Sequence, residues 1–240
     1  IINEGEQGSY FYGGGICLLY PLNIDLTGRL VVVVGGGGVA ERKVCGILAA
    51  NTDVSIRLVA PKITEQLNVF ADAGQIRWVR GHYVRSVLEG AFLVYAATDT
   101  HDVNALVAVD AVKIGALVNV IDDAASSSFQ VPSTVRRGDL LLTVSTGGGS
   151  PAFSRMIRME LEQFYPSSFG TWLERAAVLR AEIQQRLPTS AARVSFWRNA
   201  LHPNILTMVR NGELEKAEVE LRHAALDIGA QSSNGSGGGA

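Results

Sequence analysis

The sequence predicts an α/β protein in which a doubly wound parallel sheet is followed by a small β region and a helical domain. Three observations lead to this prediction. Short β-branched segments alternate with longer helical segments from residue 30 to about residue 122, the pattern of a parallel sheet with crossover helices. Two strand-like segments then follow one another without a helix between them. The remaining residues have helical periodicity that is interrupted at prolines.

The first region, residues 30 to about 122, contains the strands and helices of the predicted parallel sheet. The predicted strands are 30–34, 54–59, 76–80, 92–97 and 116–121. The predicted helices are 39–50, 63–73 and 101–114. We expect the second strand to stop before Pro61, because proline disfavours helical geometry in the residue that precedes it.

The second region begins with a predicted antiparallel hairpin of strands 128–136 and 140–145. Ser150 then has the position of a helix N-cap, and Pro151 that of the first helical turn. Residues 152–226 are expected to be helical, with interruptions at Pro166, Pro188 and Pro203. The ends, 1–19 and 229–240, have the composition of flexible segments.

Composition excludes several classes of protein. The 240 residues are 47% hydrophobic and 18% charged with a net charge of −2, so neither a disordered chain nor a nucleic-acid-binding protein is indicated. The apolar runs are too short to span a bilayer, and we expect a soluble, cytoplasmic protein without membrane contact. Cys17 and Cys45 have neither disulfide nor zinc-site spacing, and the four histidines lack metal-ligand spacing, so no metal site is expected.

A glycine-rich segment follows the first strand. Residues 35–40 read G-x-G-x-x-A between an apolar strand and an amphipathic helix, the arrangement that binds a dinucleotide pyrophosphate in a Rossmann-like sheet. The acid that usually ends the second strand and binds the ribose is missing, because Val59-Ala60-Pro61-Lys62 stands there. These residues by themselves leave NAD and NADP as alternatives.

Several short motifs occur in one order along the chain. They are Gly35-Gly36-Gly37-Gly38-Val39-Ala40-Glu41-Arg42-Lys43, Val59-Ala60-Pro61, Ala96-Ala97-Thr98-Asp99, Asn119-Val120-Ile121-Asp122, Phe129-Gln130-Val131-Pro132-Ser133 and Val144-Ser145-Thr146-Gly147-Gly148-Gly149-Ser150-Pro151. Together they resemble the precorrin-2 dehydrogenase / sirohydrochlorin ferrochelatase family, which includes the amino-terminal half of the fused siroheme synthases.

The resemblance implies an organisation and a function. It implies an NAD-binding Rossmann domain at 20–127, a central dimerisation region at 128–150 and a helical substrate-cleft domain at 151–228. It further implies a homodimer that uses NAD to oxidise precorrin-2 to sirohydrochlorin in siroheme biosynthesis. Insertion of Fe²⁺ as a substrate follows in many members, whereas others are dehydrogenases only, and both alternatives stay open here.

The resemblance also suggests site residues. Asp122 matches the catalytic aspartate of the family, and it follows the carboxyl end of a strand, where ligands bind in open α/β sheets. The expected cofactor-binding residues are Gly35, Gly37, Gly38, Val39, Ala40, Pro61, Lys62 and Thr98. The expected substrate-binding residues are Asn119, Ser145, Thr146 and Gly148. Candidate partners for the carboxylates of the tetrapyrrole are Arg136, Arg137, Arg155 and Arg158.

Two other classes share the glycine-rich loop. A nucleotide-sensing regulatory protein would normally add a basic recognition helix, but charges of both signs are mixed over 152–226. A methyltransferase that uses S-adenosylmethionine usually ends its second strand with an acid, which is missing here. We therefore favour the dehydrogenase over both classes.

Overall fold

The computed structural model describes residues 19–50, 53–187 and 189–234. The chain divides between Val131 and Pro132 into two compact units, and each unit is described by itself. The sequence analysis divides the chain after residues 127 and 150 instead, and that division stays a prediction.

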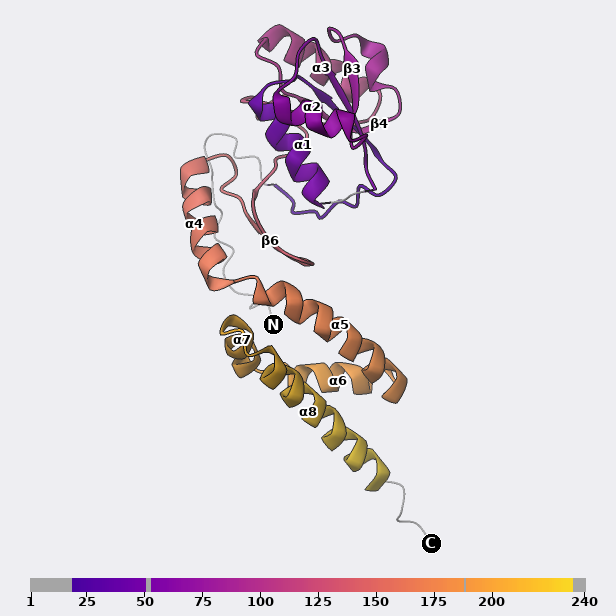
Figure 1. The fold of residues 1–240 in the computed structure, drawn as a ribbon, viewed down its shortest axis with the longest axis vertical. Helices are drawn as coiled ribbons and strands as arrows, with labels where there is room; N and C mark the ends of the chain where they lie inside the picture. Colours follow the sequence, from indigo (N-terminus) through magenta and orange to yellow (C-terminus); the bar gives the residue numbers. More distant parts are fainter. Residues whose placement is uncertain (1–18, 51–52, 188, 235–240) are drawn as a thin grey trace, which may run out of the picture. The chain divides into compact units, whose positions relative to one another are not determined.

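The first unit is built on a parallel sheet of five strands (Figure 1). The strands are β1 (Leu30–Val34), β2 (Ser55–Ala60), β3 (Arg77–Arg80), β4 (Ala91–Ala96) and β5 (Leu117–Val120). Their order is β3-β2-β1-β4-β5, and each neighbouring pair is parallel. The chain therefore winds outward in opposite directions from β1, and the switch point lies between β1 and β4.

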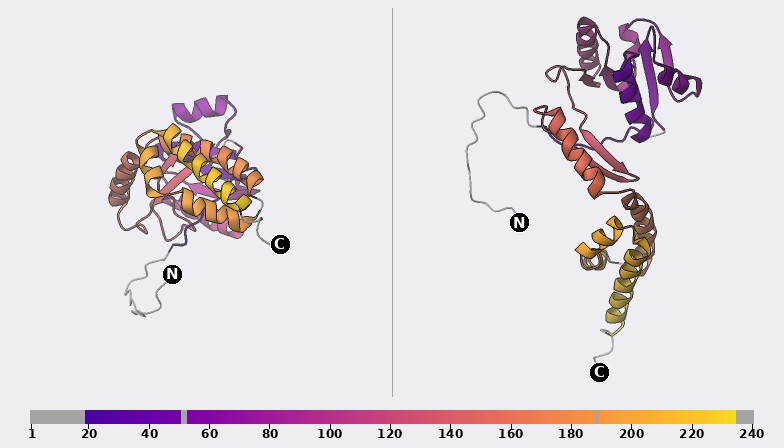
Figure 2. Two further views of the ribbon diagram at one scale, coloured as in Figure 1. Left: turned by 90° about the horizontal axis from the view of Figure 1, so that it is seen from below. Right: turned by 60° about the vertical axis from the view of Figure 1, so that its left-hand side comes forward.

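Helices cover both faces of this sheet. On one face α1 (Gly38–Ala50) and α2 (Glu65–Asp72) pack on a cluster that contains Val31 and Val33. On the other face α3 (His101–Lys113) and the short helix η1 (Arg85–Leu88) pack on Val32 and Val34. The four valines are 0–1% exposed, so β1 is a central strand buried on both faces, as its unbroken apolar run requires. The right-hand view of Figure 2 shows helices on both sides of this sheet.

The predicted strands and helices of the sheet are confirmed, with ends displaced by one or two residues, and η1 was not predicted. The strand expected over 128–136 begins only at Ser133, so that prediction was wrong over its first five residues. The cause lies at the edge of β5. Val118 N donates to Ser128 Oγ (2.7 Å) and Val120 N donates to Ser127 Oγ (2.9 Å), so serine hydroxyls take the place of a further strand.

The second unit combines a hairpin with helices. Strands β6 (Ser133–Arg137) and β7 (Leu140–Val144) pair antiparallel. The helices are α4 (Pro151–Phe164), α5 (Ser168–Arg186), α6 (Ser190–Ala200), α7 (Pro203–Arg210) and α8 (Leu214–Asn234). The breaks near Pro166 and Pro203 are as predicted, whereas Pro188 lies outside the described residues. The break at 211–213, between α7 and α8, was not predicted.

Two glycines allow the turn of the hairpin to pack closely against α5. A Cβ on Gly170 would lie 2.9 Å from the carbonyl carbon of Arg137, and Gly138 has a φ of +56° in the hairpin turn. The backbones of the turn and of α5 therefore approach more closely than any other residue at Gly170 would allow. Beyond this contact, α5–α8 share a core that contains Trp172, Phe196 and Leu221.

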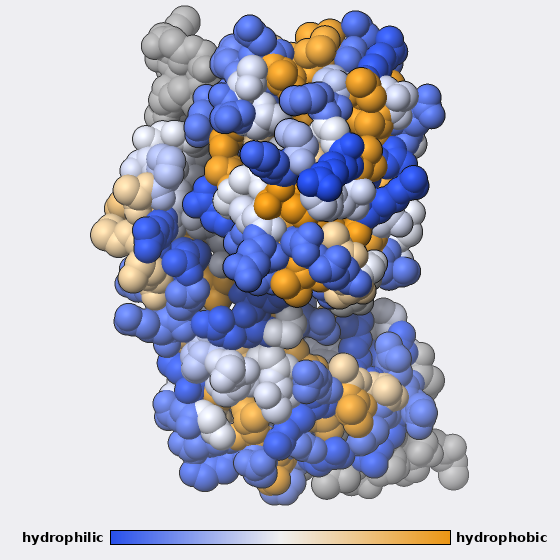
Figure 3. All heavy atoms as spheres, turned by 45° about the horizontal axis from the view of Figure 1, so that its top comes forward, coloured by the Kyte–Doolittle hydropathy of each residue, from blue (hydrophilic) through white to orange (hydrophobic). Residues whose placement is uncertain are grey.

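Apolar side chains also lie on the surface of both units. On α3 the large exposed apolar side chains are Leu106, Val109 and Val112, and on α4 they are Phe153, Met156, Met159 and Phe164. Figure 3 shows orange groups of apolar residues between hydrophilic ones on one face of the molecule. Among the residues that the structure describes, no helix is both long enough and apolar enough to cross a membrane.

Candidate functional site

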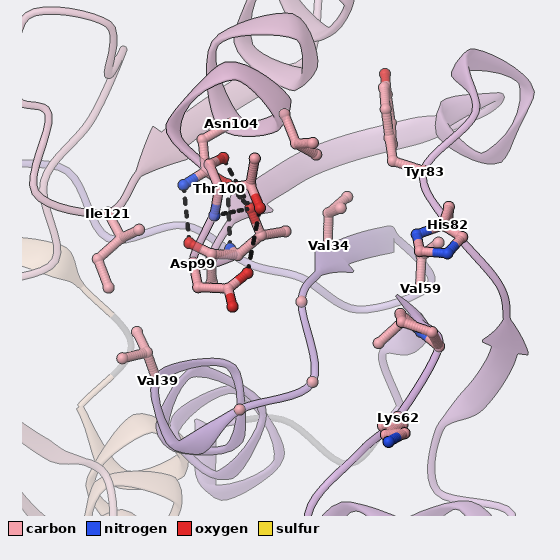
Figure 4. Close-up of a pocket in the computed structure, with 18 of the residues that line it drawn as sticks. Val34, Val39, Val59, Lys62, His82, Tyr83, Asp99, Thr100, Asn104 and Ile121 are labelled. Atoms are coloured by element: carbon pink, nitrogen blue, oxygen red, sulfur yellow. Dashed lines mark hydrogen bonds between the residues drawn. The ribbon is translucent and has the colours of Figure 1, made fainter.

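A cavity of about 830 Å³ lies at the carboxyl ends of the strands of the first unit. The segments that follow β1, β2, β3, β4 and β5 all contribute to its lining (Figure 4). Its volume is in the range of small-molecule sites, and its position at the switch point is where open α/β sheets bind ligands.

The glycine loop between β1 and α1 lines this cavity. Gly35 has a φ of +124°, and a Cβ there would lie 2.2 Å from Ala97 O. A Cβ on Gly36 would lie 2.0 Å from Lys62 O, whereas nothing lies within 4 Å of a Cβ on Gly37 or Gly38. No side chain therefore fits at Gly35 or Gly36, because backbone oxygens lie too close. At Gly37 and Gly38 the space beside the backbone is open.

Gly36 is a residue that the sequence analysis missed, because the dinucleotide motif treats its position as variable. We expect Gly36→Ala to destabilise the protein by about 1–3 kcal/mol, the usual cost of forcing extra atoms into a packed place. Gly38→Ala is the matched control, since it adds the same methyl group where nothing lies within 4 Å. Urea denaturation measures both, and equal midpoints for the two variants would contradict the contact with Lys62 O.

The start of α1 adds an electrostatic feature to the loop. The first four N–H groups of a helix have no acceptor within the helix, and its N-terminus carries partial positive charge. The glycine loop leads directly into Gly38, the first residue of α1. Bare backbone at Gly37 and Gly38 would therefore let a pyrophosphate approach these N–H groups.

A side-chain clamp fixes the loop after β4. Asn104, which is 5% exposed, accepts from Thr98 N at 3.1 Å and donates through Nδ2 to Thr98 O at 3.0 Å. Thr98 Oγ1 lies 2.7 Å from Asn104 Oδ1 and accepts from Thr100 N at 3.2 Å. Figure 4 shows these bonds as dashed lines beside the cavity. The clamp holds the backbone of the loop at the start of α3 in one conformation.

Asp122 follows β5 at the rim of the cavity. Its φ of +55° is left-handed, and it is the one non-glycine residue with positive φ in the described part of the chain. Such a conformation costs energy for a residue with a side chain, although Asp tolerates it better than most. Ile121 N donates to Ala96 O at 3.0 Å, which ties this turn to the end of β4.

The two neighbouring aspartates have different surroundings. Asp123 Oδ1 accepts from Ser126 N at 3.0 Å, and hydrogen bonds from Ser126 lower the pKa of the Asp123 carboxyl. Within residues 19–50, 53–187 and 189–234, the exposed Asp122 carboxylate has no hydrogen-bond or ion-pair partner. Asp123 therefore holds the turn, and Asp122 is free to act on a ligand.

Most of the predicted cofactor residues lie around this one cavity. The residues that line it are Gly35, Gly37, Gly38, Val39, Pro61, Lys62 and Thr98, together with Asp122. Ala40 does not line it, because its side chain is fully buried in the core under α1. Asn119 does not line it either, and its amide donates to Phe129 O at 3.1 Å.

The remaining predicted substrate residues, Ser145, Thr146 and Gly148, belong to the second unit. Thr146 Oγ1 accepts from Ser150 N at 3.1 Å and lies 3.0 Å from Ser154 Oγ, so this hydroxyl fixes the start of α4. Ser145 Oγ accepts from Gly147 N at 3.2 Å, and Gly147 and Gly148 have positive φ values. The loop is thus held by its own side chains.

The four candidate arginines of this unit also differ. Arg137 donates to Tyr165 O at 2.8 Å and to Glu162 O at 3.2 Å, which caps the end of α4. Arg158 forms an ion pair with Glu162. Arg136 and Arg155 are exposed, and they are the stronger candidates for binding carboxylates.

The sequence analysis missed several residues of the cavity wall. They follow β3 and β4, and they are Gly81, His82, Tyr83, Asp99, Thr100 and His101. Their shared signal in the sequence is that each follows the end of a predicted strand, and Asp99 also stands in the motif Ala96-Ala97-Thr98-Asp99. Among the described residues, no group of three or more His, Cys, Asp or Glu side chains could hold a metal ion.

A doubly wound parallel sheet with a glycine loop and an open cavity at its switch point defines a dinucleotide-binding protein of the Rossmann type. Comparisons with known proteins specify the family. Residues 22–133 match the family described as "Putative NAD(P)-binding". Residues 137–163 match "Sirohaem biosynthesis protein central", and residues 168–225 match "Sirohaem synthase dimerisation region". Together these matches support the resemblance to the amino-terminal half of siroheme synthase that the sequence indicates.

Individual relatives agree with this family. Siroheme synthase of Photorhabdus laumondii is 39% identical over 201 residues, which cover 84% of this chain and 42% of the relative. Siroheme synthase 1 of Pectobacterium atrosepticum is 40% identical over 207 residues, which cover 86% and 43%. The solved structure of SirC, a precorrin-2 dehydrogenase, is 27% identical and has a TM-score of 0.71, with 88% of this chain and 98% of that chain covered. The chain spans less than half the length of the curated relatives that it matches.

Proposed function

We propose that this protein oxidises precorrin-2 to sirohydrochlorin with NAD⁺ as a step of siroheme biosynthesis. The observation that carries the proposal is that one cavity contains both a glycine loop suited to a dinucleotide and, at its rim, the carboxylate of Asp122, which has no partner among the described residues. The similarity to SirC, a precorrin-2 dehydrogenase, supports the choice of substrate.

The residues of the cavity fit a dinucleotide. Space beside Gly37 and Gly38 would admit the pyrophosphate to the start of α1, and the Thr98 loop, held by Asn104, would contact the nicotinamide half. NAD⁺ supplies the hydride acceptor of the reaction. The protein would hold the nicotinamide ring and the tetrapyrrole in one relative orientation. The hydride transfer then takes place within one complex instead of depending on a bimolecular encounter.

Asp122 has the role of proton acceptor in this proposal. Oxidation of precorrin-2 removes a hydride and a proton, and the hydride goes to the nicotinamide, so the proton needs a base. We assign the base to Asp122, because Asp99, the other carboxylate of the described lining, accepts from Thr100 Oγ1 at 3.3 Å and hydrogen bonds from Ser126 occupy Asp123. The left-handed backbone of Asp122 fixes the direction from which this carboxylate enters.

Anaerobic incubation of the protein with precorrin-2 and NAD⁺ tests the proposal. The absorption spectrum should change to that of sirohydrochlorin only when both compounds are present. Titration with S-adenosylmethionine distinguishes the methyltransferase alternative, since we expect no binding of that compound. A protein that binds NAD⁺ but leaves precorrin-2 unchanged would favour the nucleotide-sensing alternative.

Insertion of Fe²⁺ into sirohydrochlorin is a second candidate activity. Insertion must displace two pyrrole N–H protons, and the same free carboxylate of Asp122 could accept them. Iron would then be a substrate rather than a resident cofactor. Adding Fe²⁺ after the oxidation is complete tests this activity, and a siroheme spectrum that forms no faster than without protein would reject it.

We propose that the protein is a homodimer. The match of residues 168–225 to a dimerisation region supports this state, and the sequence analysis assigns the contact to the hairpin region 128–150. Sedimentation should give about twice the 25.6 kDa mass of one chain at micromolar concentration. Changing Leu141 and Thr143 of β7 to Lys should weaken the dimer if the hairpin lies in the interface. A monomeric wild type would reject the dimer, and an unaffected double variant would assign the contact to the helices instead.

A further inference from the structure

The charged side chains of the cavity are unevenly distributed. Asp99 follows β4 and Asp122 follows β5, so both carboxylates of the lining lie toward that edge of the sheet. Lys62 follows β2 and His82 follows β3, at the other edge, whereas a second histidine of the lining, His101, follows β4. Figure 4 shows Lys62 and His82 on the right, around Val59, and Asp99 and Ile121 on the left. The lysine of the described lining therefore lies at the end beyond β2 and β3, where the lining has no carboxylate, and we call this the basic end.

The basic end lies where a Rossmann-type sheet binds the adenosine ribose. In proteins selective for NAD, a carboxylate at the end of the second strand binds the ribose hydroxyls and repels a 2′-phosphate. Here Pro61 and Lys62 follow β2. Asp53 precedes β2 and so lies at the amino ends of the strands, away from the cavity. Glu65, the first residue of α2, does not line the cavity. The described lining thus lacks the carboxylate that would exclude a phosphate at this end.

The backbone holds both basic residues in place. Lys62 O lies against Gly36, and Thr64 N donates to Gly36 O at 3.1 Å, which joins the segment after β2 to the glycine loop. Gly81 N donates to Ala60 O at 3.2 Å, so the residue before His82 is hydrogen-bonded to the end of β2. Hydrogen bonds therefore fix the backbone next to Lys62 and His82, which follow the neighbouring strands β2 and β3.

We propose that Lys62 and His82 form a subsite for the 2′-phosphate of NADP⁺, and that the cavity accepts NADP⁺ as well as NAD⁺. This proposal rests on the proposed function, because it takes the cavity to be the coenzyme site. The Lys62 ammonium carries three donors, and the His82 ring donates from N–H in either protonation state. Charge-assisted hydrogen bonds to a phosphate are about twice as strong as neutral ones.

Calorimetric titration with NAD⁺ and NADP⁺ at one low ionic strength tests the proposal. We expect the wild type to bind NADP⁺ within about tenfold of its affinity for NAD⁺. Lys62→Glu should raise the ratio of the two dissociation constants, NADP⁺ over NAD⁺, by about tenfold to a hundredfold. His82→Gln should raise it by a smaller factor. Arg77→Glu is the matched control, because Arg77 is exposed at the other end of β3, and the ratio should stay at the wild-type value.

The outcomes separate this inference from the proposed function. Binding of NAD⁺ together with NADP⁺ binding more than about a hundredfold weaker would overturn the subsite while leaving the dehydrogenase proposal in place. A ratio in Lys62→Glu equal to that in Arg77→Glu would also overturn it. Failure of the wild type to bind either dinucleotide would contradict both proposals.

Discussion

Replacing Asp122 with Asn should abolish the oxidation of precorrin-2 while the affinity for NAD⁺ stays close to that of the wild type. The amide has the shape of the carboxylate but cannot accept the proton, and loss of a positioned base costs about 10²–10⁴-fold in rate. Asn also tolerates the left-handed backbone found at this position, where φ is +55°, so the turn after β5 should survive. Asp122→Ala should lose activity to the same extent.

Asp123→Asn is the matched control for this prediction. The amide oxygen can still accept from Ser126 N, so the turn is kept, and turnover should remain within a few-fold of the wild type because Asp123 is not the base. Turnover and calorimetric NAD⁺ affinity are measured for all variants. Wild-type turnover in Asp122→Asn would remove Asp122 from the mechanism.

Replacing Gly37 with Asp should abolish NAD⁺ binding without unfolding the protein. Nothing lies within 4 Å of a Cβ at Gly37, so the side chain fits, and an acid near the start of α1 favours the helix. The carboxylate would nevertheless face the pyrophosphate, and two like charges about 4 Å apart near a surface repel by about 4 kcal/mol. We therefore expect the affinity for NAD⁺ to fall by about a hundredfold or more.

Two variants complete this experiment. Gly46→Asp adds the same charge at an exposed position of α1 that also has nothing within 4 Å, and NAD⁺ affinity should not change. Gly38→Leu adds bulk without charge and should have a milder effect than Gly37→Asp. If calorimetry found normal NAD⁺ binding in both Gly37→Asp and Gly38→Leu, the glycine loop between β1 and α1 would not be the segment that binds the cofactor.

The parallel sheet and its glycine loop could be predicted because their signals are local. The unbroken valine run of β1 is typical of a strand buried on both faces, and glycines directly before a helix indicate an anion site. Asp122 could be placed at the site for a similar reason, since it follows the end of a strand. Each of these features depends on neighbours within a few residues of the chain.

The rest of the site depends on contacts between distant segments. His82 reaches the cavity because β3 pairs with β2, and Gly36 is required because the segment after β2 lies against it. The strand predicted from residue 128 failed for the same reason, because Ser127 and Ser128 bond to the edge of β5. Asn119 and Thr146 have side chains suited to a ligand, and only the structure gives their partners, Phe129 O and the start of α4.

The yield of NADH per tetrapyrrole tests the central claim most directly. With enzyme in excess over precorrin-2 under anaerobic conditions, and with NAD⁺ supplied, each sirohydrochlorin formed should be accompanied by one NADH. The same mixture with Asp122→Asn should give neither product although NAD⁺ remains bound. Formation of sirohydrochlorin without an equal amount of NADH, or an unchanged yield in Asp122→Asn, would contradict the account.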